Sequence, residues 1–232
     1  MLALIASPPS PKARAFSSSH SPSTQVSDRG VFELSLAGKT LGTETFEIRS
    51  SAEKVEAHAE IHLHVEQGGK PIDVETYPSL VFDKQLHPVT YTWKQKGSQS
   101  SQLEVDFRSS PVQARYKTVN GEEDRRDFDL PQDVVVLDDN VVHHYQLVVD
   151  RYGLTAGGKQ TFNAFIPQEA LPGIISVEET GTEPTTVNGS TVNLHHLVIT
   201  TELAHVNLWV DEQRHLQRVS IPESQFEAVR RQ

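Results

Sequence analysis

The strongest constraint on the fold is a run of alternating polar and apolar side chains between Glu56 and Glu66. In the sequence EAHAEIHLHVE, every even-numbered position is Glu or His and every odd-numbered position is apolar. Successive side chains of a β-strand point to opposite faces. This period of two therefore predicts a strand with one face on a core and the other in water or in a polar groove.

The same alternation recurs along most of the chain and is interrupted by residues that favour turns. Gly68-Gly69 and Asn120-Gly121 are the strongest turn signals, and the second pair is typical of a two-residue hairpin loop. The charged run at 123–127 mixes both signs and is interpreted as a solvated turn. Besides the strand at 56–66, we expect strands at 31–37, 43–49, 72–77, 89–96, 102–108, 112–119, 160–166, 174–179, 191–201, 205–210 and 216–221.

One segment departs from the strand pattern and predicts a helix over 139–152. Apolar side chains recur there at helical spacing until Gly153, and Asp138 and Asp139 are available as N-caps. Capping explains these two carboxylates more simply than acid–base chemistry or metal binding does. We expect a helix of about three to four turns that packs across one face of the sheet.

Paired histidines occur at two places. His143 and His144 point about a quarter-turn apart on the predicted helix, so they do not converge on one ligand and are expected at its surface, with His143 facing away from the apolar stripe. His195 and His196 point to opposite faces of a strand. We expect His196 to be a core or groove residue that needs a hydrogen-bond partner.

Together these patterns predict a mainly β fold with a single domain over 28–232. A large antiparallel sheet with one apolar face curls, and enough curvature produces a half-barrel or barrel-like sheet with an interior groove. The segment at 1–27 is rich in Ser and Pro and is expected to be a disordered tail. Its apolar start, MLALIA, and the small-x-small site Ala13-Arg14-Ala15 are typical of a remnant of a secretory signal. We expect an exported protein, with a cytoplasmic one as the alternative.

The composition excludes several classes of function. The net charge is −10, from 21 basic and 31 acidic residues, so a nucleic acid or an anionic membrane surface is not expected as a partner. The absence of Cys excludes disulfides, thiolate metal sites and a Cys nucleophile. No apolar run is long enough to span a bilayer. The chain has no phosphate-binding Gly-rich loop and no Gly-x-Ser-x-Gly elbow, so we assign no cofactor and no catalytic residue.

A metal site is one interpretation of the His/Glu strand face. His58, His62 and His64 share that face with glutamates, and imidazoles two positions apart on a strand can reach one metal ion. A solvated strand face explains the same residues without any ligand, because tetrahedral sites usually need a ligand from a second element. A metal-binding protein or a hydrolase that uses this face therefore stays an alternative hypothesis.

Aromatic side chains give the main indication of a ligand surface. Trp93 shares a face with Tyr91, and Trp209 lies on the polar face of its strand, where it either covers a second layer or lines a groove. An apolar or amphipathic ligand, such as a lipid, would meet such rings inside a curved sheet. The groove-facing candidates are Tyr91, Trp93, Tyr116, Tyr145 and Trp209.

Three segments carry a resemblance to a known family. A strand, the turn Ala-Gly-Lys-Thr-Leu-Gly and a return strand at 32–48, the closing hairpin with Trp-Val-Asp and Leu-x-Arg-Val at 206–222, and the stretch VLDDNVVHHY at 136–145 resemble a family of uncharacterised exported bacterial proteins. The resemblance implies a half-barrel sheet similar to that of the lipoprotein carriers LolA and LolB. It carries over no functional residue, and the chain lacks the Cys of a lipoprotein.

Three hypotheses of function follow. The first is a non-enzymatic, exported β-rich domain that holds an apolar or amphipathic ligand or scaffolds a partner protein. The second is a metal protein or enzyme that uses the His/Glu strand face. The third is an accessory domain that folds beside a hydrolase, because some proteins of the resembling kind precede such a domain.

Overall fold

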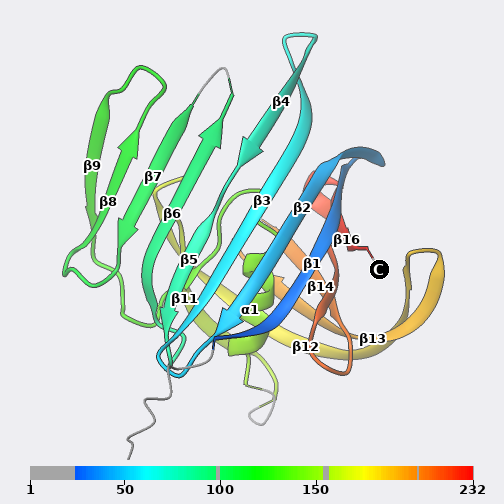
Figure 1. Ribbon diagram of the computed structural model, residues 1–232. Helices are drawn as coiled ribbons and strands as arrows, with labels where there is room; N and C mark the ends of the chain where they lie inside the picture. Colours follow the sequence, from blue (N-terminus) through cyan, green and yellow to red (C-terminus); the bar gives the residue numbers. More distant parts are fainter. Residues whose placement is uncertain (1–23, 98–99, 154–156, 203, 232) are drawn as a thin grey trace, which may run out of the picture.

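The computed structural model describes residues 24–97, 100–153, 157–202 and 204–231. Its strands form one large, mostly antiparallel sheet, and a single α-helix lies against that sheet in the described part of the chain (Figure 1). The predicted mainly β architecture with a large curved sheet is therefore confirmed. The strands are β1 (Gln25–Leu36), β2 (Lys39–Ser50), β3 (Lys54–Gln67), β4 (Lys70–Thr76), β5 (Ser79–Asp83), β6 (Pro88–Lys96), β7 (Ser101–Asp106), β8 (Val112–Lys117), β9 (Glu123–Phe128), β10 (Val135–Val136), β11 (Gln160–Ile166), β12 (Leu171–Val187), β13 (Ser190–Thr200), β14 (His205–Val210), β15 (Leu216–Ile221) and β16 (Phe226–Arg230).

The order of the strands in the sheet largely follows the chain. It runs β10–β11–β12–β13–β14–β15–β16–β1–β2–β3–β4–β6–β7–β8–β9, while β5 pairs with β3 and β6. The chain's first and last strands, β1 and β16, lie side by side in the middle of this order. The two ends of the order are β10, which runs parallel to β11, and β9, which pairs with β8.

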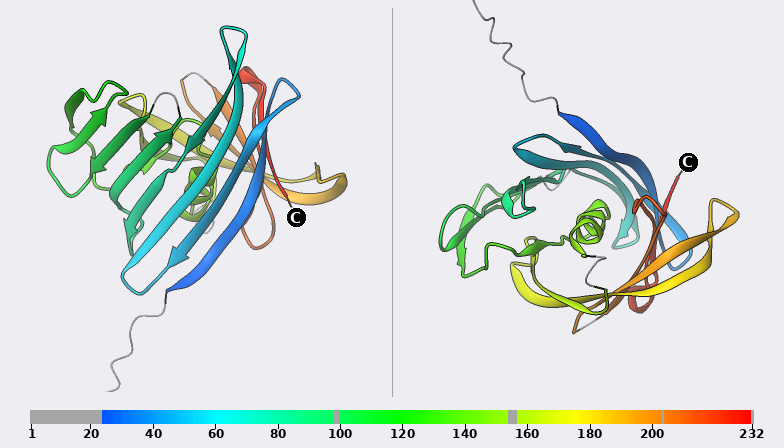
Figure 2. Two further views of the ribbon diagram at one scale, coloured as in Figure 1. Left: turned by 45° about the horizontal axis from the view of Figure 1, so that its top comes forward. Right: turned by 90° about the horizontal axis from the view of Figure 1, so that it is seen from below.

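The sheet curls around the helix α1 (His143–Arg151), which lies on its concave side (Figure 2). Alternate side chains of the central strands, such as Phe32, Leu34 and Ile48, are buried on this inner face. They belong to the same core as Leu147 and Val148 of α1. The helix therefore fills the interior, where the sequence predicted a groove that the helix covers in part.

The helix begins later than expected and is not capped by the predicted residues. It covers nine residues, its N-cap position is Val142, and no side chain of that residue caps it. Asp138 and Asp139 lie before this position, so the capping role predicted for them is wrong. The Asp138 carboxylate instead accepts hydrogen bonds from the Tyr91 hydroxyl and from the backbone N–H of Gln168.

Some strands lack the alternation on which the sequence interpretation depends. The run at 123–127 was expected as a solvated turn, but it lies in the edge strand β9. Five of the six residues of β9 are exposed, so neither face of this strand is buried. An edge strand without a buried face has no apolar period, and its charges discourage pairing with other chains. Strands β5, β10 and β16 were likewise not expected from the sequence.

The two ends of the sheet order come together through side chains. The Tyr116 hydroxyl of β8 donates to the Pro167 carbonyl at 2.9 Å, and the rings of Phe128 and Phe165 lie 4.8 Å apart. We call this junction between β8–β9 and residues 165–169 the seam. Because it consists of side-chain contacts, the seam lacks the cooperative backbone ladder that joins neighbouring strands elsewhere.

The distal half of the β12–β13 hairpin covers part of the outer face of the sheet. Its Val187 and Leu194 pack against Trp209 of β14 and Val229 of β16, away from the main core. We call residues 181–194 the flap. The flap gives the outer face of β14–β16 a small second core.

The N-terminal boundary differs slightly from the expected one, since β1 already begins at Gln25. The disordered tail and the signal remnant predicted at 1–27 fall mainly on residues 1–23, which lie outside the described residues. Within the described part, no helix has the length and apolar character that crossing a membrane requires.

Candidate functional site

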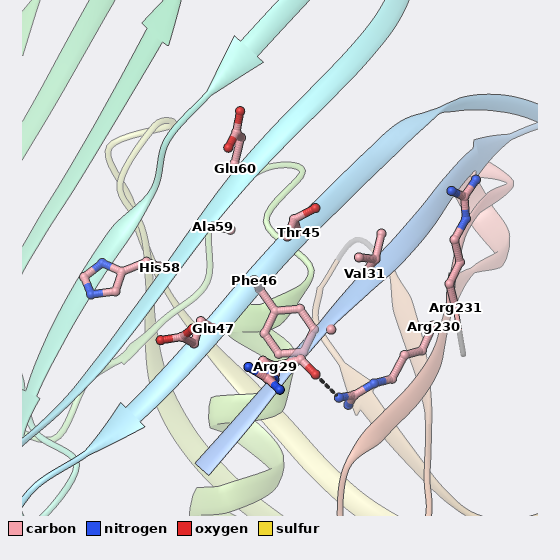
Figure 3. A pocket seen from close by; sticks show the side chains of 11 residues that line it. Arg29, Val31, Thr45, Phe46, Glu47, His58, Ala59, Glu60, Arg230 and Arg231 are labelled. Atoms are coloured by element: carbon pink, nitrogen blue, oxygen red, sulfur yellow. Dashed lines mark hydrogen bonds between the residues drawn. The ribbon is translucent and has the colours of Figure 1, made fainter. Parts of the chain in front are cut away.

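The outer face of the sheet beside the flap has a hollow of about 820 Å³. It lies where β16, β1, β2 and β3 run next to one another (Figure 3). A strongly twisted sheet is saddle-shaped, so its outer face can be concave along one diagonal even though the sheet wraps around a helix on the other side. Side chains that point away from α1 line the hollow, namely Arg29, Val31, Thr45, Glu47, His58, Glu60 and Arg231.

Strand register aligns these side chains in two cross-strand rows. Directly opposite residues of an antiparallel pair point to the same face, so each row forms one continuous strip of side chains. The first row consists of a valine, a threonine and a glutamate, whereas the second row places a glutamate between an arginine and a histidine. The rows are Val31–Thr45–Glu60 and Arg29–Glu47–His58.

The arginines of the hollow differ in how far they are neutralised. Arg231 pairs with Glu33 at 2.5 Å, and Arg230 pairs with the buried carboxylate of Asp28 at 2.6 Å. Arg230 also donates to the Arg29 carbonyl at 2.6 Å (Figure 3). The guanidinium of Arg29 has no ion-pair partner within the described residues. Arg29 is thus the cation of this site that is available to an anionic group.

The histidines predicted as metal ligands lie on the outer face of β3 and each has a different partner. His58 Nδ1 lies 2.9 Å from the Ser79 hydroxyl, and His62 Nε2 lies 2.8 Å from Glu60. His64 contacts Asp73 of β4. No group of three or more metal-type ligands comes together in the part of the chain that the structure describes. Burial lowers the pKa of His58, the one member that lines the hollow.

On the inner face, a buried carboxylate holds the N-terminal end of α1. Glu44 of β2 is fully buried and accepts the backbone N–H groups of Val142 at 2.6 Å and His143 at 2.7 Å. Its Oε1 also lies 3.0 Å from His143 Nδ1. A helix N-terminus presents unpaired N–H groups and a partial positive charge, so a carboxylate at this position is stabilising. Glu44 performs the capping that the sequence assigned to Asp138 and Asp139.

The two helix histidines are core residues, so the expected surface position is wrong. Both His143 and His144 are fully buried, and their rings lie 4.8 Å apart. The helix fills the interior of the curved sheet, so even the face opposite its apolar stripe meets a strand. Neither ring nitrogen of His144 has a hydrogen-bond partner among the described residues. Burial, and then the nearby His143, lower the pKa of His144 well below its usual range.

A second polar cluster lies beside the seam. The Tyr91 hydroxyl of β6 donates to the Asp138 carboxylate, which also accepts the backbone N–H of Gln168 at 2.9 Å. Burial raises the pKa of Asp138 to about 6, and these hydrogen bonds partly oppose that rise. Burial also raises the pKa of Asp139 to about 6, and a hydrogen bond to the Glu169 carboxyl adds to the effect.

Three of the predicted groove aromatics are tyrosines whose surroundings include these carboxyls. Tyr91 is fully buried and bonded to Asp138. Burial raises the pKa of Tyr116 to about 12, with a smaller upward contribution from Asp138, and the pKa of Tyr145 to about 12, with a contribution from Asp139. Tyr91 alone of the three bonds one of these carboxyls, whereas the Tyr116 hydroxyl donates to the Pro167 carbonyl.

The two predicted tryptophans lie elsewhere. Trp93 packs on the main core from β6. Trp209 belongs to the second core, where its indole N–H donates to Glu183 of the flap at 2.6 Å. Its ring stacks on His196, which finds the partner it was expected to need in Asn207, at 3.0 Å. Trp209 thus covers a second layer, one of the two alternatives that its place on a polar strand face left open.

Comparisons with known proteins identify the family of the chain. No curated protein matches it. A solved structure of a DUF1089 family protein from Pseudomonas aeruginosa is similar, with a TM-score of 0.47, 15% identity, and coverage of 78% of this chain and 90% of that one. The predicted likeness to LolA and LolB stays a prediction. A family model described as a protein of unknown function, DUF3108, matches residues 31–224. The chain therefore belongs to the DUF3108 family of proteins of unknown function.

Proposed function

We propose that this chain is a non-enzymatic binding domain and that its binding site is the hollow on the outer face of β16, β1, β2 and β3. The observation that carries the proposal is the hollow itself, about 820 Å³ in volume and left uncovered while the flap covers the neighbouring strands. This volume is in the range of small-molecule sites, which span about 300–1,000 Å³.

The interior of the sheet is a weaker candidate for the same role. Helix α1 fills the concave side, and its side chains belong to the main core. A hollow beside the helix, between Phe82, Val136 and Leu147, measures about 10 Å³. A cavity of that size holds about one water molecule. A ligand on the inner face would therefore have to displace the helix.

The charges around the hollow favour an amphipathic ligand with an anionic end. Arg29 offers a guanidinium that has no ion-pair partner among the described residues, and Val31 and Thr45 provide short, weakly polar side chains next to it. Guanidinium groups bind carboxylates and phosphates through two parallel hydrogen bonds. Glu47, directly across from Arg29 on β2, and Glu60 on β3 disfavour a second anionic group on the β2–β3 side of the hollow.

Native mass spectrometry of the full chain purified from its own host tests this proposal. The expected result is a bound small molecule that denaturing extraction releases. Arg29→Glu should lose the molecule, because the substitution reverses the charge at the anionic end. Arg108→Glu is the matched control, since Arg108 is an exposed arginine on the β7–β8 turn, outside the hollow. The proposal is rejected if native wild-type protein carries no bound molecule, or if both variants keep it equally.

Export is part of the proposal and has its own test. The support is the apolar start of the sequence together with the small-x-small site at Ala13-Arg14-Ala15. Fractionation of the host followed by N-terminal analysis of the protein should find a mature chain outside the cytoplasm. A full-length chain in the cytoplasmic fraction would contradict export and leave the binding proposal untouched.

A further inference from the structure

The two ends of the sheet order differ in how they are protected against pairing with another strand. β10 consists of two residues, which makes it a poor template for a partner strand. β9 has six residues, contains no proline and pairs with β8 without a bulge. Figure 1 shows β9 at the outer margin of the sheet, with no strand beyond it. The free edge of β9 is therefore a regular row of backbone groups that only its charges protect.

The hairpin between β8 and β9 determines which residues direct their backbone groups to this free edge. The Thr118 N–H donates to the Glu122 carbonyl at 2.9 Å, so these two residues form a hydrogen-bonded pair. Hydrogen-bonded and non-hydrogen-bonded pairs alternate along an antiparallel ladder. Asp124 therefore bonds to β8, whereas Glu123 and Arg125 present their N–H and C=O groups to the free edge. Among the described residues, no backbone hydrogen bond from another segment reaches these groups.

The charges along β9 are poorly matched within the chain. Arg125 lies directly opposite Arg115 of β8, and neither guanidinium has an ion-pair partner among the described residues. Like charges directly opposite each other destabilise a strand pair. A second strand that placed a carboxylate beside Arg125 would relieve this repulsion.

We propose that β9 joins two copies of this chain into a dimer, with Glu123 of each copy directly opposite Arg125 of the other in an antiparallel ladder. Such a ladder forms only where two edge-directed residues oppose each other. Pairing Glu123 with Arg125 gives opposite charges on both sides of the two-fold axis, whereas a ladder centred on Arg125 sets two arginines against each other. A ladder that pairs Arg125 with Asp127 sets Glu123 against Asp129. Charges on an edge reject strands that do not complement them, and this edge complements itself.

The two-fold axis of this dimer passes through Asp124. The carboxylate of Asp124 pairs with Arg126 of its own chain at 2.8 Å, so a cation lies beside each of the two carboxylates that meet there. The contact uses one short strand from each copy, so we expect a weak dimer that forms reversibly. β9 lies apart from β16, β1, β2 and β3 in the sheet, so the proposal does not depend on the outer hollow.

Cysteine crosslinking tests the register, because the chain has no cysteine of its own. Asp124→Cys places two thiols at the axis, where the Cα atoms of a non-hydrogen-bonded pair lie about 4.5 Å apart, close enough for a disulfide. Mild oxidation of this variant should give a covalent dimer. Asp127→Cys is the matched control, since this residue is exposed on the same strand but its two copies would lie about 20 Å apart. Equal crosslinking of the two variants, or none of Asp124→Cys, overturns the proposal.

Sedimentation velocity of the full chain measures the dimer itself. Wild type should change from monomer to dimer as its concentration is raised to about 1 mM. Glu123→Arg should weaken the dimer about tenfold, because it sets two arginines against each other in each hydrogen-bonded pair. Adding Arg125→Glu to that variant restores the opposite charges and should restore the wild-type dissociation constant.

The double variant separates a contact between copies from a defect within one copy, which a second charge reversal would not repair. The proposal is overturned if the double variant dimerises as weakly as Glu123→Arg does. A wild-type chain that stays monomeric up to about 1 mM also overturns it and leaves the edge of β9 to an extended segment of another protein.

Discussion

The two faces of the sheet use polar side chains in opposite ways. On the inner face, Glu44 is fully buried and all its described hydrogen bonds go to the N-terminal end of α1. On the outer face, Arg29 stands at the edge of an open hollow with no ion-pair partner in the described chain. A polar group that is buried and fully bonded determines structure, whereas an exposed and unpaired one is free to bind a ligand. Substitutions on the two faces should therefore separate stability from binding.

The largest effect is expected at Glu44 on the inner face. Glu44→Ala removes the cap and leaves the N–H groups of Val142 and His143 without an acceptor in the core. Breaking such a buried charged interaction costs about 3–5 kcal/mol. Urea denaturation measures the loss. The matched control is Glu33→Ala on the outer face of β1, whose half-exposed pair with Arg231 should contribute less than about 1 kcal/mol. Equal losses would contradict the contrast between the faces.

A substitution under the flap tests whether part of the outer face stabilises the fold, in contrast to the open hollow beside it. Leu194→Ala removes a buried side chain from the second core beneath the flap. Leu→Ala substitutions in cores cost about 2–5 kcal/mol. The side chains of a small cluster can move partly into the space that the missing leucine leaves, so the cost here should lie at the lower end of that range. We expect a loss of about 2 kcal/mol in denaturant unfolding, with a red shift of the fluorescence of Trp209. No change in either signal would mean that the flap does not cover Trp209 in solution.

The buried imidazole of His144 should make the inner face sensitive to acid. Its pKa is lowered in the fold, so the unfolded chain binds the extra proton, and stability present above pH 6.5 is lost as the pH falls. Each pH unit over which only the unfolded chain is protonated costs about 1.4 kcal/mol. His144→Leu should remove this part of the pH dependence. The unfolding free energies of His144→Leu and wild type should be measured at pH 7.5 and at pH 5. If the difference between the two proteins is the same at both pH values, the prediction for His144 is wrong.

The smallest effect on stability is expected at Arg29. Arg29→Glu changes an exposed side chain without a described ion pair, but it places a carboxylate directly across from Glu47, so the unfolding free energy should fall by less than about 1 kcal/mol. Thermal and denaturant unfolding should therefore stay close to wild type, while ligand retention is lost. A clearly destabilised variant would indicate that Arg29 is structural, and the contrast between the two faces would have to be redrawn.

The strands with a buried face could be predicted from the sequence, and those without one could not. The Glu56–Glu66 alternation lies within β3, because odd-numbered residues there reach the core. Strand β9 is charged on both faces and carries no such period. β10 consists of Val135 and Val136 alone, too short for any periodicity to be recognised.

The candidate sites depended on partners that are distant in the chain. The sequence placed Asp138 correctly next to a helix but gave no sign that Glu44, 98 positions before Val142, would take over the cap. Tyr91 was identified as an inward-facing ring, while its bond to Asp138 requires the curvature that brings β6 to α1. The hollow likewise arises from the register of four neighbouring strands. Side-chain direction follows from local pattern, whereas convergence follows from tertiary structure.

The remote cap of α1 has a consequence for the order in which the chain folds. A helix of nine residues is too short to persist by itself in water. Its capping carboxylate arrives only when β2 is in place, so the helix should become stable late, after the strands around it have paired. A chain of this kind would collapse first as a sheet with an empty concave side, and the rate of filling that side would be limited by long-range loop closure.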